Sequence, residues 1–324
     1  MGTSRFPDGI SMTGVLAQMS ALILCGMALQ RLQPLGIDPE RLRRAVTGLV
    51  FNALLPALVL SALWGAGAHP QGWKISLFGA ATVLFGLSAA LCLDRALRLD
   101  RRQTGATLLG IAFSNVTFLG LPVLERLFGP ELARPIVIQI DLFSTAPLVF
   151  TLGVYIASRY GEVRANLSTA LRALLLNPPL WTAFAAMMLG DFDIPRPAVL
   201  EPLLETAASA VAPLMLLALG LGLRWNSWRK ENTRLVALAS GLKLIALPLF
   251  GLSLTHGLGI AGDTRAALVL EAGMPSMLLG IVYCDRYRLD TELYAMLATT
   301  TTLLALVSLP AWHLLLGTFI GSPA

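Results

Sequence analysis

Charge is scarce in this sequence. Only 13% of its 324 residues are Asp, Glu, Lys or Arg, whereas roughly a quarter of the residues of a soluble globular protein are charged. Histidine and cysteine are also rare, with three of each. His69, His256 and His313 lack an acid, serine or cysteine at the spacing of an intramembrane hydrolase or metalloprotease. No phosphate-binding glycine loop is present. We therefore predict neither an enzyme nor a metal or cofactor site.

Long apolar runs are what the sequence does contain. Hydrophobic residues make up 56% of the chain and the mean hydropathy is +0.71. Each run has about 20 residues or more, enough for a helix to cross a hydrocarbon core of about 30 Å. The sequence predicts an all-α polytopic protein of the inner or plasma membrane. Its ten predicted transmembrane helices cover 10–31, 45–66, 74–94, 104–126, 134–158, 172–190, 200–223, 234–256, 264–285 and 291–318.

The distribution of basic residues predicts the orientation. Of the 24 Lys and Arg residues, 17 lie in the loops that follow the odd-numbered helices, and Lys243 lies within the eighth helix. Because basic residues accumulate in cytoplasmic loops, both termini are predicted to be extracellular or periplasmic. The same loops account for a pI near 9.4, so nucleic acid is not a predicted partner. The six basic residues on the other side are Arg5, Lys74, Arg126, Arg134, Arg196 and Arg265.

The chain divides into two halves of five helices that insert with opposite orientation. We place the halves at 1–158 and 172–324, joined by a cytoplasmic loop at 159–171. Central prolines recur at Pro56 in the second helix and Pro213 in the seventh. Inverted repeats of this kind are typical of secondary transporters. Aligning helices four and nine at an offset of 160 pairs Thr104 with Thr264, Ala106 with Ala266, Leu108 with Leu268, Ala112 with Ala272, Leu119 with Leu279, Gly120 with Gly280, and Arg126 with Arg286.

Both repeated helices are interrupted at the same depth. Asn115, in SNVTFLGLP, lies eleven residues beyond Thr104, and Pro275 lies eleven residues beyond Thr264. At about 1.5 Å per residue, both interruptions reach roughly the middle of the membrane. A broken helix is tolerated there where it lines a cavity or is buried in protein. We predict a substrate site where the breaks meet, facing the free N–H groups of the second half-helices; ordinary proline kinks are the alternative.

Three ionisable residues lie within predicted membrane helices: Asp141, Lys243 and Glu271. Each costs at least about 2.5 kcal/mol at the bilayer centre. Our hypothesis is that Lys243 pairs with Asp141 or Glu271, and that the other carboxyl couples transport to protons or sodium. The alternatives are a static ion pair without coupling, and a Lys243 side chain that extends to the cytoplasmic surface.

Several segments resemble one transporter family. SNVTFLGLPVL resembles the fourth-helix motif of auxin efflux carrier family permeases, an asparagine followed by Gly-x-Pro. AGMPSMLLGIVYCDRYRLDTELYA resembles their ninth helix, FNALLPALVLSALW their second, and IVIQIDLF the glutamine-bearing fifth helix of plant relatives. The likeness covers nearly the whole chain. The sequence departs from the family at VTF after the asparagine, and it lacks the long cytoplasmic loop of the plant carriers.

The resemblance implies a fold and a function. Helices 1, 2, 6 and 7 would form a scaffold domain and helices 3–5 and 8–10 a transport domain, in which broken helices 4 and 9 cross. Small organic anions such as malate, malonate or auxin-like carboxylates would be carried by an elevator-type motion, in a homodimer formed through the scaffold. The predicted substrate-binding residues are Ser114, Asn115, Thr117, Pro275 and Ser276 at the crossover, Gln139 from helix 5, and Asn52 from the scaffold side.

Two other functions stay open at this point. A sodium-coupled symporter of organic anions, of the bile-acid type, shares the crossed ten-helix architecture. A membrane sensor that binds a metabolite without moving it would need the same kind of site. Sodium dependence separates the first alternative from our prediction, and exchange of labelled substrate separates the second.

Overall fold

The computed structural model of the chain describes residues 12–34, 36–64, 71–164, 168, 171–172, 175–224 and 228–320. Parts of the first, second, sixth and seventh predicted helices lie outside these ranges or at their edges, as do Arg5 and His69. Within the described residues the chain is helical, and its one β-bridge joins Ser114 to Ser276. The predicted all-α class is confirmed.

Six helices in the described part of the chain are long and apolar enough to cross a membrane. Each corresponds to one of the ten predicted crossings. Three lie in the first half: α2 (Pro39–Leu49) with η2 (Val50–Leu54) and α3 (Leu55–Leu63); α4 (Gly72–Leu97); and α7 (Pro130–Ile140) with η4 (Asp141–Thr145), α8 (Ala146–Leu148), η5 (Val149–Gly153) and α9 (Val154–Tyr160). Three lie in the second half: α12 (Leu200–Ser209) with α13 (Val211–Gly222); η7 (Lys230–Asn232) with α14 (Thr233–Gly241), η8 (Leu242–Ala246) and α15 (Leu247–Gly257); and α18 (Thr291–Ile320).

The other four predicted crossings are not among these six helices. They contain α1 (Met12–Leu32), α11 (Pro178–Asp191), and two broken helices. The first broken helix consists of α5 (Arg101–Ala112), η3 (Val116–Gly120) and α6 (Leu121–Phe128), and the second of α16 (Gly262–Ala272) and α17 (Leu279–Tyr287). The number of ten crossings and their inverted repeat stay predictions.

Two helix starts differ from the sequence prediction because of their caps. Asp100 caps α5 in a reciprocal capping box with Gln103, so this helix begins three residues before the predicted position 104. Asn177 accepts a hydrogen bond from the Leu180 N–H and is followed by Pro178 at the first helical position. Helix α11 therefore begins at Pro178, six residues after the predicted start at 172.

Prolines explain most of the widened π-helical turns. Proline has no N–H, and its ring clashes with the carbonyl four residues earlier in an α-helix. A wider turn relieves that clash. Four of the five π segments described, η2, η3, η4 and η8, begin six residues before Pro56, Pro122, Pro147 and Pro248 respectively; η5 has no such proline.

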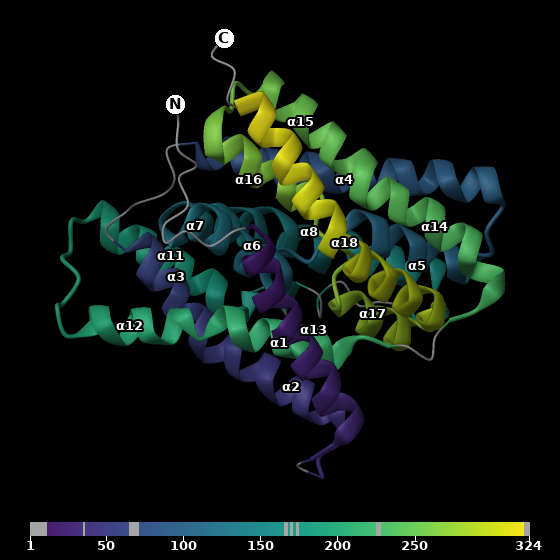
Figure 1. Cartoon of the computed structure of the whole chain (residues 1–324), viewed down its shortest axis with the longest axis horizontal. Coiled ribbons are helices and arrows are strands. Elements are labelled where there is room, and N and C mark those ends of the chain that lie inside the picture. The colour runs from purple at the N-terminus through teal and green to yellow at the C-terminus, as the bar shows by residue number, and fades with distance from the viewer. Residues whose placement is uncertain are drawn as a thin grey trace.

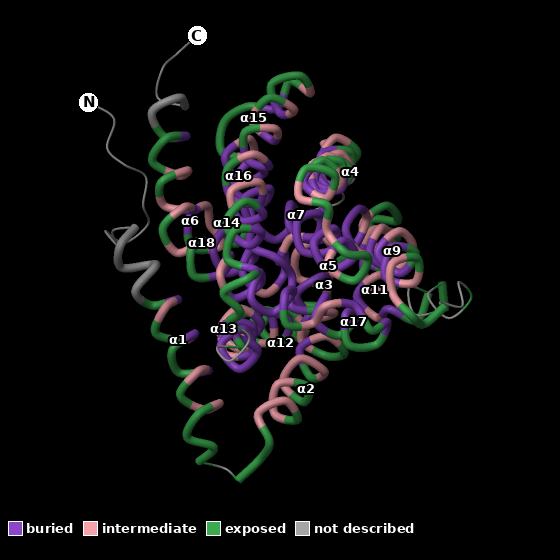
Figure 2. The backbone as a smooth tube through the Cα atoms, turned by 90° about the vertical axis from the view of Figure 1, so that its right-hand side faces the viewer, coloured by how far each residue is buried: buried purple, intermediate pink, exposed green. Residues whose placement is uncertain are grey.

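The helices pack in two sets (Figure 1). Helices α1, α2, α3, α11, α12 and α13 contact one another, and the segments from α4 to α9 contact those from α14 to α18. Gly26 of α1 and Gly220 of α13 face each other so closely that a Cβ on either would overlap the other helix's backbone, a packing device typical of membrane helices. Buried residues concentrate inside the second set, on α5 and α16, whereas the described side chains of α1 and α2 are mainly exposed or half-buried (Figure 2).

Candidate functional site

The two broken helices meet at their interruptions. The Asn115 N–H donates to the Pro275 carbonyl at 2.8 Å, and the Met277 N–H donates to the Phe113 carbonyl at 3.2 Å. These two bonds run on either side of the bridge between Ser114 and Ser276. The short extended segments thus satisfy backbone groups that the breaks release. The predicted contact between Asn115 and Pro275 is confirmed.

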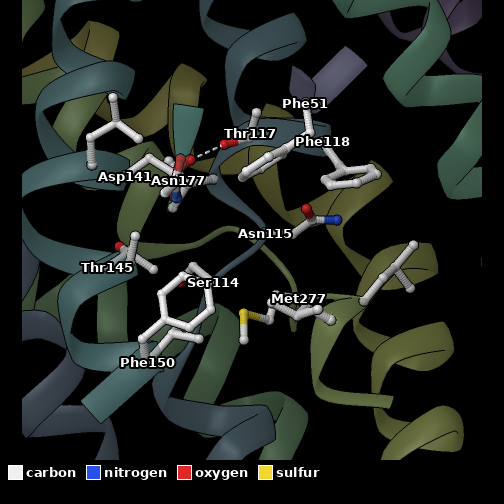
Figure 3. Close-up of a pocket in the computed structure, with 16 residues that line it drawn as sticks. Phe51, Ser114, Asn115, Thr117, Phe118, Asp141, Thr145, Phe150, Asn177 and Met277 are labelled. Atoms are coloured by element: carbon white, nitrogen blue, oxygen red, sulfur yellow. Dashed lines mark hydrogen bonds between the residues drawn. The ribbon is translucent and has the colours of Figure 1, made fainter. Parts of the chain in front are cut away.

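A cavity of about 630 Å³ opens beside this crossover. Its wall includes the start of η3, at 116–118, and the residues leading into α17, at 277–279. The first N–H groups of a helix have no intrahelical acceptor, and together they carry a partial positive charge. Both second half-helices therefore present the same electrostatic sign to one cavity. Figure 3 shows this cavity and the side chains around it.

Asn115 is the polar side chain at the centre of this arrangement. It lines the cavity, yet it is only 2% exposed, and its Nδ2 group has no hydrogen-bond partner among the described residues. In Figure 3 the amide lies between the side chains of Phe118 and Met277. A buried amide without a partner costs about 1–3 kcal/mol, so this donor is available to a ligand.

Thr117 and Asp141 connect the crossover to the helix that follows it. The Thr117 hydroxyl donates a hydrogen bond to the Asp141 carboxylate, and both residues line the cavity (Figure 3). Thr117 lies in η3 and Asp141 begins η4, so both belong to turns widened ahead of a proline.

Lys243 lies on η8 and contacts the crossover through Ser114. Its side chain is fully buried, and Nζ donates to the Ile111 carbonyl and to Ser114 Oγ, both at 2.8 Å. Among the described residues it forms no ion pair, because both of these acceptors are neutral. The hypothesis that Lys243 pairs with Asp141 or Glu271 is therefore wrong in this structure. Its burial also contradicts the alternative in which the side chain extends to the cytoplasmic surface.

Glu271 lies on the other side of the crossover from the main cavity. It is 2% exposed on α16 and lines a second cavity of about 290 Å³. Neither carboxylate oxygen has a hydrogen-bond partner among the described residues. Ser114, Val116 and Thr145 line both cavities, so only the crossover and η4 separate the two spaces.

Two of the predicted binding residues lie elsewhere. Gln139 donates to Ser76 Oγ at 2.8 Å and packs against Gly72 at the start of α4, outside both cavities. Asn52 is exposed on η2 and donates to the Gly48 carbonyl of its own helix. Neither contributes to the site in this structure. Phe51, which precedes Asn52 in the sequence, lines the main cavity instead.

The predicted Ser276 has a structural role at the crossover. It is fully buried, and its hydroxyl donates to the Gly110 carbonyl at 2.6 Å. Its N–H donates to Thr301 Oγ1 of α18 at 3.2 Å. Ser276 and Pro275 thus shape the break without lining the main cavity.

Sequence reasoning missed two polar residues of the cavity wall. Asn177, 4% exposed, contributes from the N-cap of α11, and Thr145 from the end of η4. The Asn-Pro-Pro run at 177–179 is a recognisable helix start. It gives no indication, however, that this start faces the crossover. Thr145 carries no sequence signal that distinguishes it from other membrane threonines.

Fold and site together define a multi-pass helical membrane protein with a largely apolar cavity, bearing a few polar side chains, beside the crossing of two interrupted helices. The chain belongs to the family described as Membrane transport protein, which it matches over residues 21–313. The resemblance to the auxin efflux carrier family is thereby confirmed at the family level. The protein is a membrane transporter of this family.

Curated relatives are transporters as well. The chain is 28% identical over 309 residues to an uncharacterized transporter of Methanothermobacter thermautotrophicus, covering 94% of this chain and 98% of that protein. It is 30% identical over 237 residues to an uncharacterized transporter of Methanocaldococcus jannaschii, covering 71% and 75% of the two chains. The uncharacterized transporter YfdV of Escherichia coli is 24% identical over 202 residues, or 61% of this chain and 63% of its own.

Proposed function

We propose that the protein is a secondary carrier of small organic anions, and that it binds their carboxylate at the crossover of the two broken helices. One observation carries this proposal: a single cavity is lined by the N-terminal ends of both second half-helices and by the unpartnered amide of Asn115. Helix N-termini attract anions, and a free amide donor supplies a hydrogen bond in a site shielded from water.

The buried Lys243 ammonium group next to the crossover also favours an anionic ligand. The Lys243 ammonium donates to Ser114, which lines the cavity, and no carboxylate in the described part of the chain pairs with it. In surroundings of low dielectric constant, an uncompensated cation favours an anion nearby. The hydrophobic residues of the wall, among them Phe51, Phe118, Phe150 and Met277, suit the apolar part of an organic acid.

The packing of the helices suggests how a bound anion would move. In our proposal the set containing α1, α2, α3 and α11 to α13 is the scaffold, and the remaining helices form the transport domain. The main cavity lies between them, because Phe51 and Asn177 belong to the first set and Asn115 to the second. An elevator-type displacement of the transport domain would carry the site across the membrane. A homodimer through the scaffold, and termini outside the cell, complete the proposal.

Counterflow tests the proposed function. Purified protein is first screened by thermal shift with acetate, malonate, malate and indole-3-acetate, and a carboxylate that raises the melting temperature is radiolabelled. Proteoliposomes preloaded with the unlabelled anion should then accumulate label transiently, and Asn115→Ala should reduce this at least tenfold.

Three results would contradict the proposal. Binding without exchange would indicate a sensor. Exchange that requires sodium would indicate a symporter of the bile-acid type. Exchange that Asn115→Ala leaves unchanged would place the site away from the crossover.

A further inference from the structure

A second polar cavity lies behind the crossover, and it contains an acid that the proposed anion site does not use. The cavity encloses about 290 Å³ between α4, η4 and α16. Its polar lining consists of Thr82, Ser114, Thr145 and Glu271. We call this space the Glu271 cavity. Thr82 donates to the Phe78 carbonyl and Ser114 accepts from Lys243, whereas both Glu271 oxygens are without a partner among the described residues.

A glycine on the neighbouring broken helix allows the Glu271 carboxyl group to lie close to that helix. The carboxyl group lies against Gly120 in η3, where an added Cβ would overlap both carboxyl oxygens. Only a residue without a side chain allows this approach. The carboxyl therefore touches the half-helix whose first turn carries Thr117 and lines the anion cavity. A change of charge on Glu271 acts directly on that half-helix.

An ionised Glu271 has no compensating group among the side chains that the structure describes. The elements packed against α16 are α4, α6, α7, η3, α15 and α18. Among the titratable groups that these elements carry, Asp141, at the end of α7, acts electrostatically on Glu271, and its charge has the same sign. Lys243, the nearby cation, is occupied by Ile111 and Ser114. A buried charge without a partner is strongly unfavourable, so the protonated, neutral acid fits this site.

We propose that Glu271 is a proton-binding site that couples anion transport to the proton gradient, an inference that rests on the proposed function. The Glu271 carboxylate takes a proton from water on one side of the membrane and returns it to water on the other side. No electron moves, and no other bond forms or breaks. With Glu271 protonated, one negative charge fewer lies beside the half-helix that lines the anion cavity.

The surroundings favour a proton over a sodium ion. A bound metal cation needs several oxygen ligands around it, and at this cavity it would have to use the hydroxyl of Ser114. Ser114, the hydroxyl shared by both cavities, already accepts a hydrogen bond from the Lys243 ammonium at 2.8 Å. A second cation ligated by Ser114 would be repelled by this ammonium group.

The first test needs no substrate. Infrared difference spectra of the purified protein, recorded as the pH is stepped in sodium-free buffer, should contain a carboxylic-acid C=O band that Glu271→Gln removes. Glu131→Gln, at an exposed position on α7, is the matched control and should keep the band. Because Gln has the shape of the neutral acid, the melting temperature of Glu271→Gln should not fall. A pH-dependent spectrum identical in wild type and Glu271→Gln would overturn the proposal.

The second test measures coupling. Proteoliposomes are given an inwardly directed proton gradient, and the accumulation of radiolabelled malate, or of the carboxylate identified by counterflow, is compared with its exchange without a gradient. Glu271→Gln should lower the ratio of accumulation to exchange at least tenfold and remove the substrate-dependent proton uptake reported by an internal pH dye. Glu131→Gln should leave both at the wild-type level.

The outcomes separate the two proposals. Net uptake of the anion by the wild type without proton movement, or accumulation driven by sodium alone, would overturn proton coupling and leave the anion carrier standing. Absence of exchange in the wild type would contradict the proposed function, while the infrared titration would still report on Glu271. A gradient response that persists in Glu271→Gln would assign the proton to another group and overturn the assignment made here.

Discussion

Two side chains at the crossover leave hydrogen-bonding groups unused where water is excluded. Among the residues that the structure describes, the Asn115 amide donor and both Glu271 oxygens have no partner, although both residues are only 2% exposed. Folding stability gains nothing from either arrangement, because each unpartnered group adds a desolvation cost. Both groups suit a site that a ligand completes. An anion would accept a hydrogen bond from the Asn115 amide, and a proton would neutralise the Glu271 carboxylate.

Asn115→Ala should weaken anion binding without weakening the fold. The lost donor would serve a charged ligand, and hydrogen bonds to charged groups contribute about 1.5–3 kcal/mol, or roughly 10- to 100-fold in Kd. The melting temperature should stay the same or rise, because Nδ2 has no partner within the described ranges. Titration calorimetry and thermal melts measure the two effects. Asn52→Ala is the control, since its exposed amide bonds only to its own helix; a similar loss of affinity in that variant would contradict the assignment.

At the scale of residues, the sequence predicts the crossover better than its surroundings. Ser114, Asn115 and Thr117 were recognisable because hydrogen-bonding residues beside a helix break have few other roles in a membrane. Gln139 and Asn52 were misplaced because the facing of a helical residue depends on the rotation of its helix. Such a rotation changes at each π turn and is set by packing, which one sequence does not show.

At the scale of elements, the prolines of this chain determine where its functional side chains lie. Thr117, Asp141 and Lys243 all lie in widened turns that begin six residues before a proline. A π turn contains an extra residue compared with an α turn, so it rotates everything that precedes it relative to everything that follows. The contact between Thr117 and Asp141 thus depends on two such turns.

Pro122→Ala should disturb transport more than stability. Alanine restores an N–H at position 122 and removes the ring that clashes with an α-helical carbonyl, so η3 can relax to a regular helix. Thr117 would then rotate away from Asp141. We expect counterflow to fall at least tenfold, with a melting temperature equal to or above that of the wild type.

Pro310→Ala is the matched control for this prediction. Pro310 lies inside α18, and the residues before it form a regular helix without a π turn. Its replacement should therefore leave counterflow within about twofold of wild type, since no functional turn depends on it. Equal losses in both variants would show that the effect of Pro122 is not exerted through η3.

At the scale of the whole molecule, the excess of basic residues on one side predicts the orientation. Glu131 and Arg164 are both exposed and lie on opposite predicted sides, outside and cytoplasmic respectively. In a background without Cys25, Cys92 and Cys284, a membrane-impermeant maleimide should label Glu131→Cys in intact cells, and Arg164→Cys only after permeabilisation. The reverse pattern would place both termini in the cytoplasm.

An elevator motion requires that contacts between the two helix sets break while contacts within each set persist. Arg134 on α7 makes one contact of each kind. Its guanidinium group pairs with Glu125 of α6 at 2.7 Å, within the proposed transport domain, and with Glu205 of α12 at 2.8 Å, across to the proposed scaffold. The same residue therefore supplies both a test pair and its control.

Cross-linking each pair should distinguish the two contacts. In the cysteine-free background, Arg134→Cys with Glu205→Cys, joined by a short bifunctional maleimide, should reduce counterflow at least tenfold, because the transport domain can no longer leave the scaffold. Arg134→Cys with Glu125→Cys, joined by the same reagent, should keep at least half of the activity of its untreated form, because both residues would move together. Counterflow before and after treatment removes the effect of losing Arg134 itself. Equal inhibition of both pairs would indicate motion within the proposed transport domain, and activity retained by both would show that α7 and α12 do not separate during transport.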